Sequence, residues 1–525
     1  MQFHDGQTVG IDLGTTFSSL AQVDEQGNPV PIANDEDEVE TPSLVLLVEG
    51  NRVVVGPNRA RAAMEDPANV IECIKRHMGD AEFQRVFDGR PITPEFVSAL
   101  ILKKLHQDTE KRIGKIGNAV ITVPYYFNDA RRKATEDAGR IAGLNVIDII
   151  NEPTAATLTY AWHRGELGGS GRADHQPRTA LVYDLGGGTF DVTVVRYTPT
   201  HFQVLATDGD VRLGGVDWDD RLVNYVADEF QARHGTDLRK SPAAIHVLRN
   251  DCDLAKLELS QKAQTSIVCR HAGKALSVTV TREQFESMTA DLLQRTADTT
   301  ELVLKQAGIT ISQLDALVMV GGSTLMPQVP RMLGQLLKRE PRHEISPHTA
   351  VAQGAAIHAA ILEAKYRGEK TAMADKVRKM LAAVKQENVN SHGLGVLAHN
   401  PKSGKDVNHL MIPRNTQLPV EVRKTFKTRC ENQRRVTVQV IEGDAPDPQA
   451  CSLLGKCRIT DLPAHLKKGS PVCVTYAFDA SGRIRVAARD ETNGKEAAIE
   501  IERRGGLSQE QIDAFTRLAN EYMVE

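Results

Sequence analysis

The chain has 525 residues, enough for more than one domain and for large apolar cores. Hydrophobic residues make up 41% of it and charged residues 25%, as in soluble globular proteins, and a net charge of −4 argues against general binding to nucleic acid or membrane surfaces. Its seven cysteines include no C-x-x-C pair, and its N-terminus shows no signal-peptide pattern. Because no apolar run reaches membrane length, we expect a cytoplasmic protein with reduced thiols.

The first predicted strand ends in a glycine turn. Residues 9–16 carry apolar residues, then an aspartate, a glycine and two adjacent threonines. Short strands are predicted over 43–48 and 53–55, and a helical pattern over about 58–114. Within that pattern, Lys75 lies in an Ile-Lys-Arg-His run, which by itself is typical of a solvated basic helix face.

Two further strands lead to a glutamate. Residues 119–124 predict a buried strand, 128–143 a helix capped by Asn128, and 146–150 another strand. The last strand places Glu152 at its carboxyl end, the edge at which ligands gather in α/β sheets. The alternative is that Glu152 only caps the next helix, since acidic side chains favour helix N-termini.

A glycine-rich octet, residues 184–191, follows a short strand at 179–183. Its three consecutive glycines permit a turn whose N–H groups surround an anion. The aspartates at its two ends would repel bare phosphate unless a divalent cation lies between them. An ordinary glycine-rich hairpin is the alternative, but the similar turn at 9–16 predicts a duplicated site that grips phosphate from two sides. Neither turn is a Walker A loop or a dinucleotide fingerprint.

The remaining α/β pattern extends to about residue 375. An amphipathic helix over 251–261 carries Lys256 and Ser260 one turn apart on one face. A third strand, at 317–320, enters another glycine turn. Strands and helices that alternate in this way predict sheets covered by helices.

The pattern changes near residue 385. A polar stretch at 386–391 is followed by period-two alternation over 436–440, 473–478 and 484–488, with a hairpin turn at 479–482. This predicts a compact β domain of several short strands. The chain then ends in one helix, for which Ser508 is the expected N-cap and Gln511 stands at the capping-box position.

These motifs resemble the ATPase signatures of the seventy-kilodalton heat-shock (DnaK-type) chaperones. The matching segments are 10–16, 123–129, 149–154, 184–191 and 320–327, with 412–416 and 482–488 in the β region. The resemblance implies an α/β actin-like two-lobed ATPase domain over 1–378, a linker over 379–391, an all-β sandwich peptide-binding domain over 392–505, and a short C-terminal helix over 506–525 that is a truncated lid.

Position by position, the resemblance implies a site for ATP and Mg²⁺. The implied residues are Lys75, Glu152, Thr189 and Asp191 for catalysis, Asp12 and Asp184 for the metal through water, and Gly14, Thr15, Thr16, Gly186, Gly187, Gly188, Lys256, Ser260, Gly321, Gly322 and Ser323 for ATP. Val436 matches a peptide-pocket position, although a plain core valine is an equally good interpretation.

The implied function is that of an ATP-dependent chaperone, which hydrolyses ATP and binds extended apolar segments of unfolded proteins in protein folding and the stress response. A J-domain co-chaperone and a nucleotide exchange factor are the implied partners. The alternative is a nucleotide-gated holdase or exchange-assisting relative with little ATP turnover. A small-molecule kinase on the same fold is a third hypothesis, but it leaves the β domain without a role.

Several positions depart from the family pattern. They are Leu325 for an arginine beside adenine, Asp253 for a glutamate beside ribose, and His348 for an aspartate near the last cleft segment. The linker lacks the apolar motif that docks on the ATPase domain, so we expect weaker ATP control of peptide release. Because the full helical lid is missing from this sequence, peptide exchange should be fast. Arg429 and Arg435 replace small residues, and if they flank the peptide channel, acidic peptides should be preferred; a peptide array without charge bias would count against this.

Overall fold

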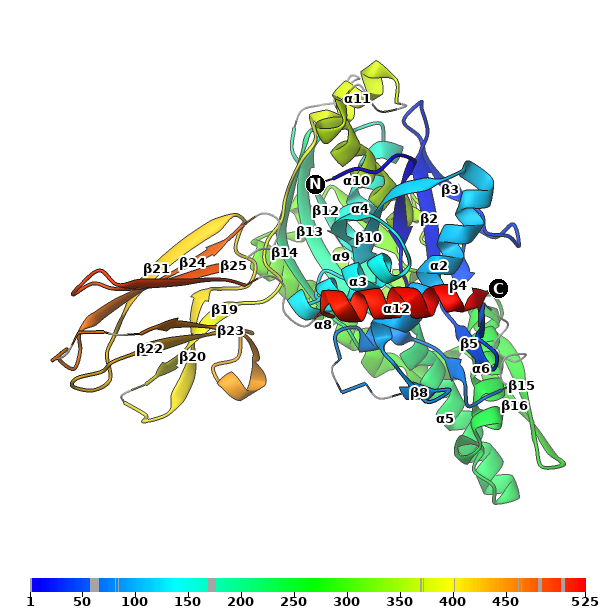
Figure 1. Ribbon diagram of the computed structural model, residues 1–525. Helices are drawn as coiled ribbons and strands as arrows, with labels where there is room; N and C mark the ends of the chain where they lie inside the picture. Colours follow the sequence, from blue (N-terminus) through cyan, green and yellow to red (C-terminus); the bar gives the residue numbers. More distant parts are fainter. Residues whose placement is uncertain are drawn as a thin grey trace.

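The computed structural model describes residues 2–525 apart from 57–65, 81, 84, 169–175, 369–370, 372, 401, 461, 464, 480–483 and 502–505. Two mixed β-sheets lie at the centre of its α/β part (Figure 1). The first sheet has the order β11-β10-β1-β2-β3, with β4 beside β2. Its strands are β1 (Gln7–Asp12), β2 (Phe17–Val23), β3 (Pro29–Ile32), β4 (Thr41–Pro42), β10 (Ile116–Val123) and β11 (Val146–Asn151).

The second sheet repeats this arrangement. Its order is β17-β12-β13-β14-β18, with strands β12 (Arg178–Leu185), β13 (Phe190–Thr198), β14 (His201–Asp210), β17 (Ala316–Val320) and β18 (Lys385–Glu387). In each sheet three antiparallel strands are joined by a parallel strand, β10 beside β1 and β17 beside β12. This is the internal duplication that the two glycine turns predict.

Helices cover both sheets and meet between them. They are α2 (Pro94–Ile113), α3 (Asp129–Ile141), α4 (Glu152–His163), α5 (Gly215–His234), α6 (Pro242–Gln261), α7 (Arg282–Met288), α8 (Ala290–Ala307), α9 (Gln328–Leu337), α10 (Ala350–Tyr366) and α11 (Asp375–Ala382). Small residues allow α10 to approach its neighbours closely. A Cβ on Gly354 would lie 1.8 Å from the Ala155 carbonyl oxygen of α4, and one on Gly10 of β1 would lie 2.0 Å from the Ala356 nitrogen.

The helical pattern predicted for 58–114 is wrong over residues 70–92. That region holds β7 (Val70–Ile71), the 3₁₀ helix η1 (Ile74–His77), β8 (Arg85–Phe87) and β9 (Arg90–Ile92), and β7 extends a small sheet with β5 (Val45–Val48) and β6 (Arg52–Val55). Among the described residues of this region, α2 is the one long helix, and it begins at Pro94 because Thr93 caps it by accepting a hydrogen bond from the Phe96 N–H. A hairpin of β15 (Gln264–His271) and β16 (Lys274–Thr281) completes the α/β part.

The β region extends away from the α/β part as two four-stranded sheets (Figure 1). One has β20 (Asp406–Ile412), β19 (Leu394–His399), β22 (Val436–Glu442) and β23 (Ser452–Ile459); the other has β21 (Val420–Lys427), β24 (Pro471–Phe478), β25 (Ile484–Asp490) and β26 (Glu496–Ile501). Their inner faces share one apolar core, and Tyr476 of β24 donates a hydrogen bond of 2.9 Å to the Gly395 carbonyl of β19. Most of the predicted turn at 479–482 lies outside the described residues.

The polar linker docks on the second sheet. Strand β18 pairs with β14 in parallel, and the polar side chains of Gln386 and Glu387 add contacts to His358 and His201. At its carboxyl end, the Tyr125 hydroxyl accepts a hydrogen bond from the Val389 N–H and donates one to the Val389 carbonyl. The buried side chains of Val384 and Val389 flank the polar strand. Docking in this structure therefore does not require an apolar linker strand.

The last helix, α12 (Gln509–Glu521), lies across the α/β part, where it contacts α2 and α3 (Figure 1). The predicted capping box at Ser508 and Gln511 is confirmed. Ile512, Ala519 and Tyr522 are buried in the core that also holds α2. After the helix, β27 (Met523–Val524) adds to the edge of β6 in parallel. The sequence predicted this helix but not its docking surface.

Candidate functional site

A cavity of about 810 Å³ lies where the glycine turns of the two sheets meet. Its wall includes most residues that the sequence predicts for the site: Asp12, Gly14, Thr15, Thr16, Lys75, Glu152, Asp184, Gly186, Gly187, Thr189, Lys256, Ser260, Gly321, Gly322 and Ser323. The structure thus brings together segments that are up to about 310 residues apart in the chain.

The two glycine turns approach each other too closely for larger residues. A Cβ on Gly187 would lie 2.3 Å from Thr16 Oγ1, and one on Gly188 would lie 2.3 Å from Thr15 Cγ2. The turn from the second sheet is braced by Ser323, whose hydroxyl donates a hydrogen bond of 3.0 Å to the Gly186 carbonyl. This leaves a backbone-lined cradle between the sheets, the arrangement that suits an anion such as a phosphate group.

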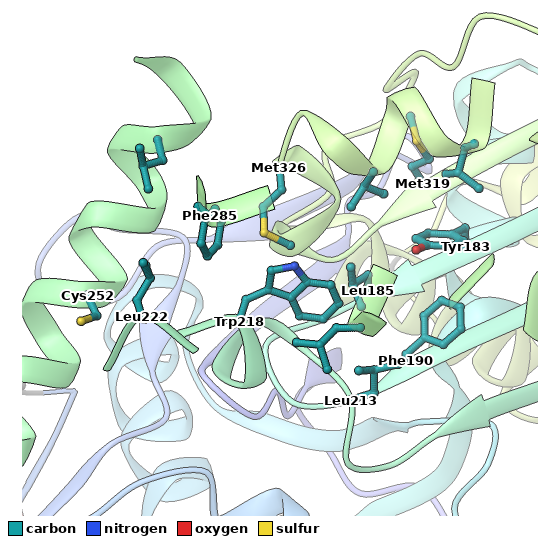
Figure 2. Close-up of a cluster of buried hydrophobic side chains, with 14 of the residues drawn as sticks. Tyr183, Leu185, Phe190, Leu213, Trp218, Leu222, Cys252, Phe285, Met319 and Met326 are labelled. Carbon is teal, nitrogen blue, oxygen red and sulfur yellow. The ribbon is translucent and has the colours of Figure 1, made fainter. Parts of the chain in front are cut away.

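Apolar packing holds the second turn from behind. Figure 2 shows Leu185 and Phe190, the residues that end β12 and begin β13, together with Leu213, Trp218 and Met326 in one buried cluster. All five side chains are almost completely inaccessible to solvent. The glycine turn therefore lies on a rigid base, because well-packed interiors deform little.

Four carboxylates gather around one lysine at the floor of the cavity. Lys75 Nζ lies 2.5 Å from Glu152 Oε1, and both side chains are less than a tenth exposed. Asp12 accepts a hydrogen bond of 2.7 Å from the Thr122 hydroxyl. Burial and, to a smaller extent, the Glu152, Asp191 and Asp12 charges raise the pKa of Asp184 well above its usual value.

The same causes act on the other members of this cluster. Burial raises the pKa of Glu152 to about 7, although Lys75 opposes the shift. Burial and the Glu152 charge raise the pKa of Asp191 to about 8. Burial lowers the pKa of Lys75, but Glu152, Asp12 and Asp184 outweigh it, so the net shift is upward and the ammonium stays charged.

This excess of negative charge fits a cation. Asp191 accepts one hydrogen bond from the Tyr125 N–H, while its second oxygen, Oδ1, is buried without a protein partner. Among the described residues, no three histidine, cysteine or acidic side chains are placed to ligate a metal directly. Asp12 and Asp184 both line the cavity, and they would hold Mg²⁺ through its water shell.

The other end of the cavity is built by α6 and by the 3₁₀ helix η4 (Gly322–Leu325). Lys256 lies 2.8 Å from Asp219 and 3.0 Å from Asp253, and the Ser260 hydroxyl donates to the Lys256 carbonyl. Leu325 lines this end and is 45% exposed, so an apolar surface faces the position expected for the base.

Three predicted residues do not line the cavity. Gly188 and Asp191 lie just behind its wall, Gly188 against Thr15 and Asp191 beneath the backbone of Tyr125. Val436 lies in β22 of the β region, where it is half-buried and packs on the apolar core. The core interpretation of Val436 therefore holds in this structure, and its role in peptide binding stays a prediction.

Sequence reasoning missed the role of Arg76. Its guanidinium donates to the Gly188 carbonyl at 2.9 Å and forms an ion pair of 2.5 Å with Asp217 on α5. It thus ties η1 to the glycine turn of the second sheet. The solvated-face interpretation of residues 74–77 is wrong for Lys75, which is 4% exposed. Arg76 directly follows Lys75, but the partners of its guanidinium lie 112 and 141 positions later in the chain, so no local pattern indicates them.

Comparison with known proteins agrees with this geometry. The family model for Hsp70 protein matches residues 8–88 and 80–525. The chain belongs to the Hsp70 family. Two relatives from strains of Halobacterium salinarum, each named chaperone protein DnaK, are 37% identical over 524 residues, which cover 98% of this chain and 78% of each relative. The Hsp70 family consists of ATP-dependent chaperones, so this chain binds ATP. None of its described helices is long and apolar enough to cross a membrane.

Cation binding by this Hsp70 chain should depend on pH. Since folding raises the pKa values of the carboxyl groups in the cluster, up to about 8 for Asp191, the cluster holds more protons in the folded chain than in the unfolded chain between about pH 4 and pH 8. The cluster therefore lowers stability progressively as pH rises through this window. A cation that neutralises the cluster should restore more stability at pH 8 than at pH 6.

We predict that Mg²⁺ added to the ADP-saturated protein raises Tm more at pH 8 than at pH 6, as measured by calorimetry. Asp184→Asn removes one carboxylate and should reduce the difference between the two pH values. Equal increments at both pH values in the unmodified protein would contradict this interpretation of the cluster.

Proposed function

We propose that this chain is an ATP-dependent chaperone that hydrolyses ATP to ADP and phosphate and binds extended apolar segments of unfolded proteins. The observation that carries the proposal is the pair of opposed glycine turns, with Lys75 and Glu152 joined at the cavity floor between them. Phosphoryl transfer to water asks mainly for positioning and for charge stabilisation. The opposed turns can provide the positioning, and Lys75 at the cavity floor can provide the charge stabilisation.

Each group in the cavity has a proposed part in hydrolysis. The N–H groups of the two turns would hold the phosphates, and the Lys75 ammonium would stabilise charge that develops on the transferred group. Thr189 lines the cavity and Glu152 is fixed by Lys75, so both can orient the attacking water. Asp191 does not line the cavity, so it would act through its charge on Glu152 and Asp184. A bound Mg²⁺, held through water by Asp12 and Asp184, would neutralise phosphate charge.

The fold supports a division of the chain into domains with separate functions. We propose an actin-like two-lobed ATPase domain at 1–378, a linker at 379–391, a β-sandwich peptide-binding domain at 392–505 and a C-terminal helix at 506–525. The two repeated sheets and the separate pair of β sheets support this division. Helix α11 ends at Ala382, so the first residues of the proposed linker are helical.

Peptide would bind the β sandwich in extended form, with main-chain hydrogen bonds to protein backbone and an apolar side chain near Val436. Burying one leucine side chain contributes about 1.5–3 kcal/mol, so affinity should be modest and tolerant of sequence. We also propose, from the family resemblance, that a J-domain co-chaperone and a nucleotide exchange factor are partners of this chain. The same resemblance favours a cytoplasmic location.

A holdase with little ATP turnover is the second candidate. The exposed Leu325 favours it, because a leucine cannot stack on the base as an arginine does and so offers weaker nucleotide binding. The charged network at Lys75 and Glu152 disfavours it. Two buried charges are expensive to keep when they serve no ligand.

Lys75→Ala should separate these candidates. We predict that it lowers the single-turnover rate of ATP hydrolysis by about 10²–10³-fold, because one preorganised charge is lost from the transition state. Nucleotide binding should stay measurable. Lys104→Ala is the matched control, since Lys104 is also buried and lies 2.8 Å from Asp108 on α2, away from the cavity. An unchanged rate in Lys75→Ala would remove Lys75 from the mechanism.

The contacts of the docked linker bear on the expectation that ATP controls peptide release only weakly. Strand β18 pairs with β14 and its own side chains are polar, so the apolar surface that undocking would expose is limited to the flanking Val384 and Val389. ATP can shift a two-state linker only by the difference in its contacts. We predict that ATP accelerates peptide dissociation modestly, and that Gln386→Leu, in the middle of β18, increases this acceleration, as measured with a fluorescent peptide. Equal acceleration in both proteins would contradict the argument.

A further inference from the structure

Residues 506–525, here called the α12 segment, pack into the core of the first sheet. Ile512, Ala519 and Tyr522 are buried in that core. The ring centre of Phe96 on α2 lies 5.6 Å from that of Phe515 and 6.0 Å from that of Tyr522. Undocking the α12 segment would therefore expose apolar surface both on the segment and on the helix beneath it.

Hydrogen bonds hold both ends of the α12 segment. At its start, the Leu507 N–H donates to the Asp137 carboxylate of α3 at 3.0 Å. At its other end, the N–H groups of Met523 and Glu525 each donate a bond of 2.9 Å to a carbonyl in or just before β6. Lys103 of α2 donates one of 2.5 Å to a carbonyl in the last turn of α12. Backbone pairing thus adds to the apolar packing.

These contacts lie on one side of the α/β part. Their partners belong to α2, α3 and β6, which pack in the core of the first sheet. None of the residues named in the two paragraphs above lines the nucleotide cavity. A ligand shifts an equilibrium only through a difference in its contacts with the two states. Exchange of ATP for ADP therefore gives no direct reason for the α12 segment to leave the first sheet.

The linker is held in a different way. Strand β18 pairs with β14 of the second sheet over three residues, and its side chains are polar. The α12 segment, by contrast, buries apolar side chains along its whole length. The linker can therefore leave the second sheet while the α12 segment stays on the first.

The docked α12 segment limits how far the β region can move. Leu507, which is bonded to α3, follows the last residue of β26, Ile501, by six positions. Six residues of extended chain span about 20 Å. On the linker side, Leu394 of β19 follows the buried Leu381 of α11 by thirteen positions, which would span about 45 Å. The α12 segment is thus the shorter of the two connections.

We propose that the α12 segment is a fixed anchor, which stays on the first sheet with either nucleotide bound and keeps the β region within about 20 Å of α3. It is not the moving lid that the family resemblance implies. When the linker undocks, the β region would pivot about the anchor without separating from the α/β part. The proposal rests on the function proposed above only for its two nucleotide states.

Hydrogen exchange of the full chain, measured by mass spectrometry with ADP and with a slowly hydrolysed ATP analogue, tests whether the anchor is fixed. Peptides that cover residues 509–525 should exchange at rates that agree within about twofold between the two nucleotides. Faster exchange of these peptides with ADP would overturn the proposal. Peptides that cover residues 184–191 should slow when either nucleotide binds. If they do not, the proposed nucleotide site fails, which is a separate outcome.

A disulfide lock tests whether the α12 segment has to move. Met523 of β27 and Arg52 of β6 are direct partners in the sheet, and both side chains are exposed. Paired strands hold such residues within disulfide reach. Oxidation of the Arg52→Cys, Met523→Cys variant should leave ATP hydrolysis and ATP-accelerated release of a fluorescent peptide within about twofold of the reduced form, because a fixed anchor loses no necessary motion.

Met523→Cys alone is the matched control, since on oxidation it can pair only with native cysteines such as the exposed Cys430. Loss of the response to ATP in the oxidised double variant, restored by reduction and absent from the control, would overturn the proposal. If the reduced form neither hydrolyses ATP nor binds peptide, the proposed function fails, and hydrogen exchange still decides whether the α12 segment stays docked.

Discussion

The whole site depends on one steric constraint, the meeting of two glycines with two threonines between the sheets. Cβ atoms on Gly187 and Gly188 would lie 2.3 Å from atoms of Thr16 and Thr15. Only hydrogen fits there, so the backbone of both turns can face one small volume. The repeated sheets bring the turns together, and the small residues of α4, α10 and β1 let the sheets approach closely enough.

When the two turns meet, the charged side chains at their bases are forced close together. Asp12 ends β1 and Asp184 is the last residue but one of the equivalent strand β12, so duplication of the sheet places two carboxylates in one enclosed space. Glu152 and Asp191 add to them, and Lys75 provides the single ammonium at this floor. Unbalanced buried charge is costly. A bound cation relieves that cost and allows a polyphosphate to approach the carboxylates, which explains why a destabilising cluster can persist in the fold.

Local patterns in the sequence predicted many of the strands, the glycine turns and the Ser508 cap, because each depends on residues a few positions apart, although β7, β8 and β9 were mistaken for helix. Contacts between distant segments were harder to predict from the sequence. Lys75 looks like part of a solvated face until Glu152, 77 positions later, lies beside it. Family motifs supplied that pairing, but they did not indicate the surface on which α12 docks. The docked linker was missed for another reason: backbone pairing in β18 leaves no apolar pattern.

If this cavity hydrolyses ATP and peptide at the β sandwich influences the reaction, the steady-state rate of ATP hydrolysis by the full chain should be measurable and should rise severalfold when a short apolar peptide is added. Neither a complete lack of hydrolysis nor ADP formation that requires a phosphorylatable small molecule is compatible with a peptide-binding ATPase of this kind.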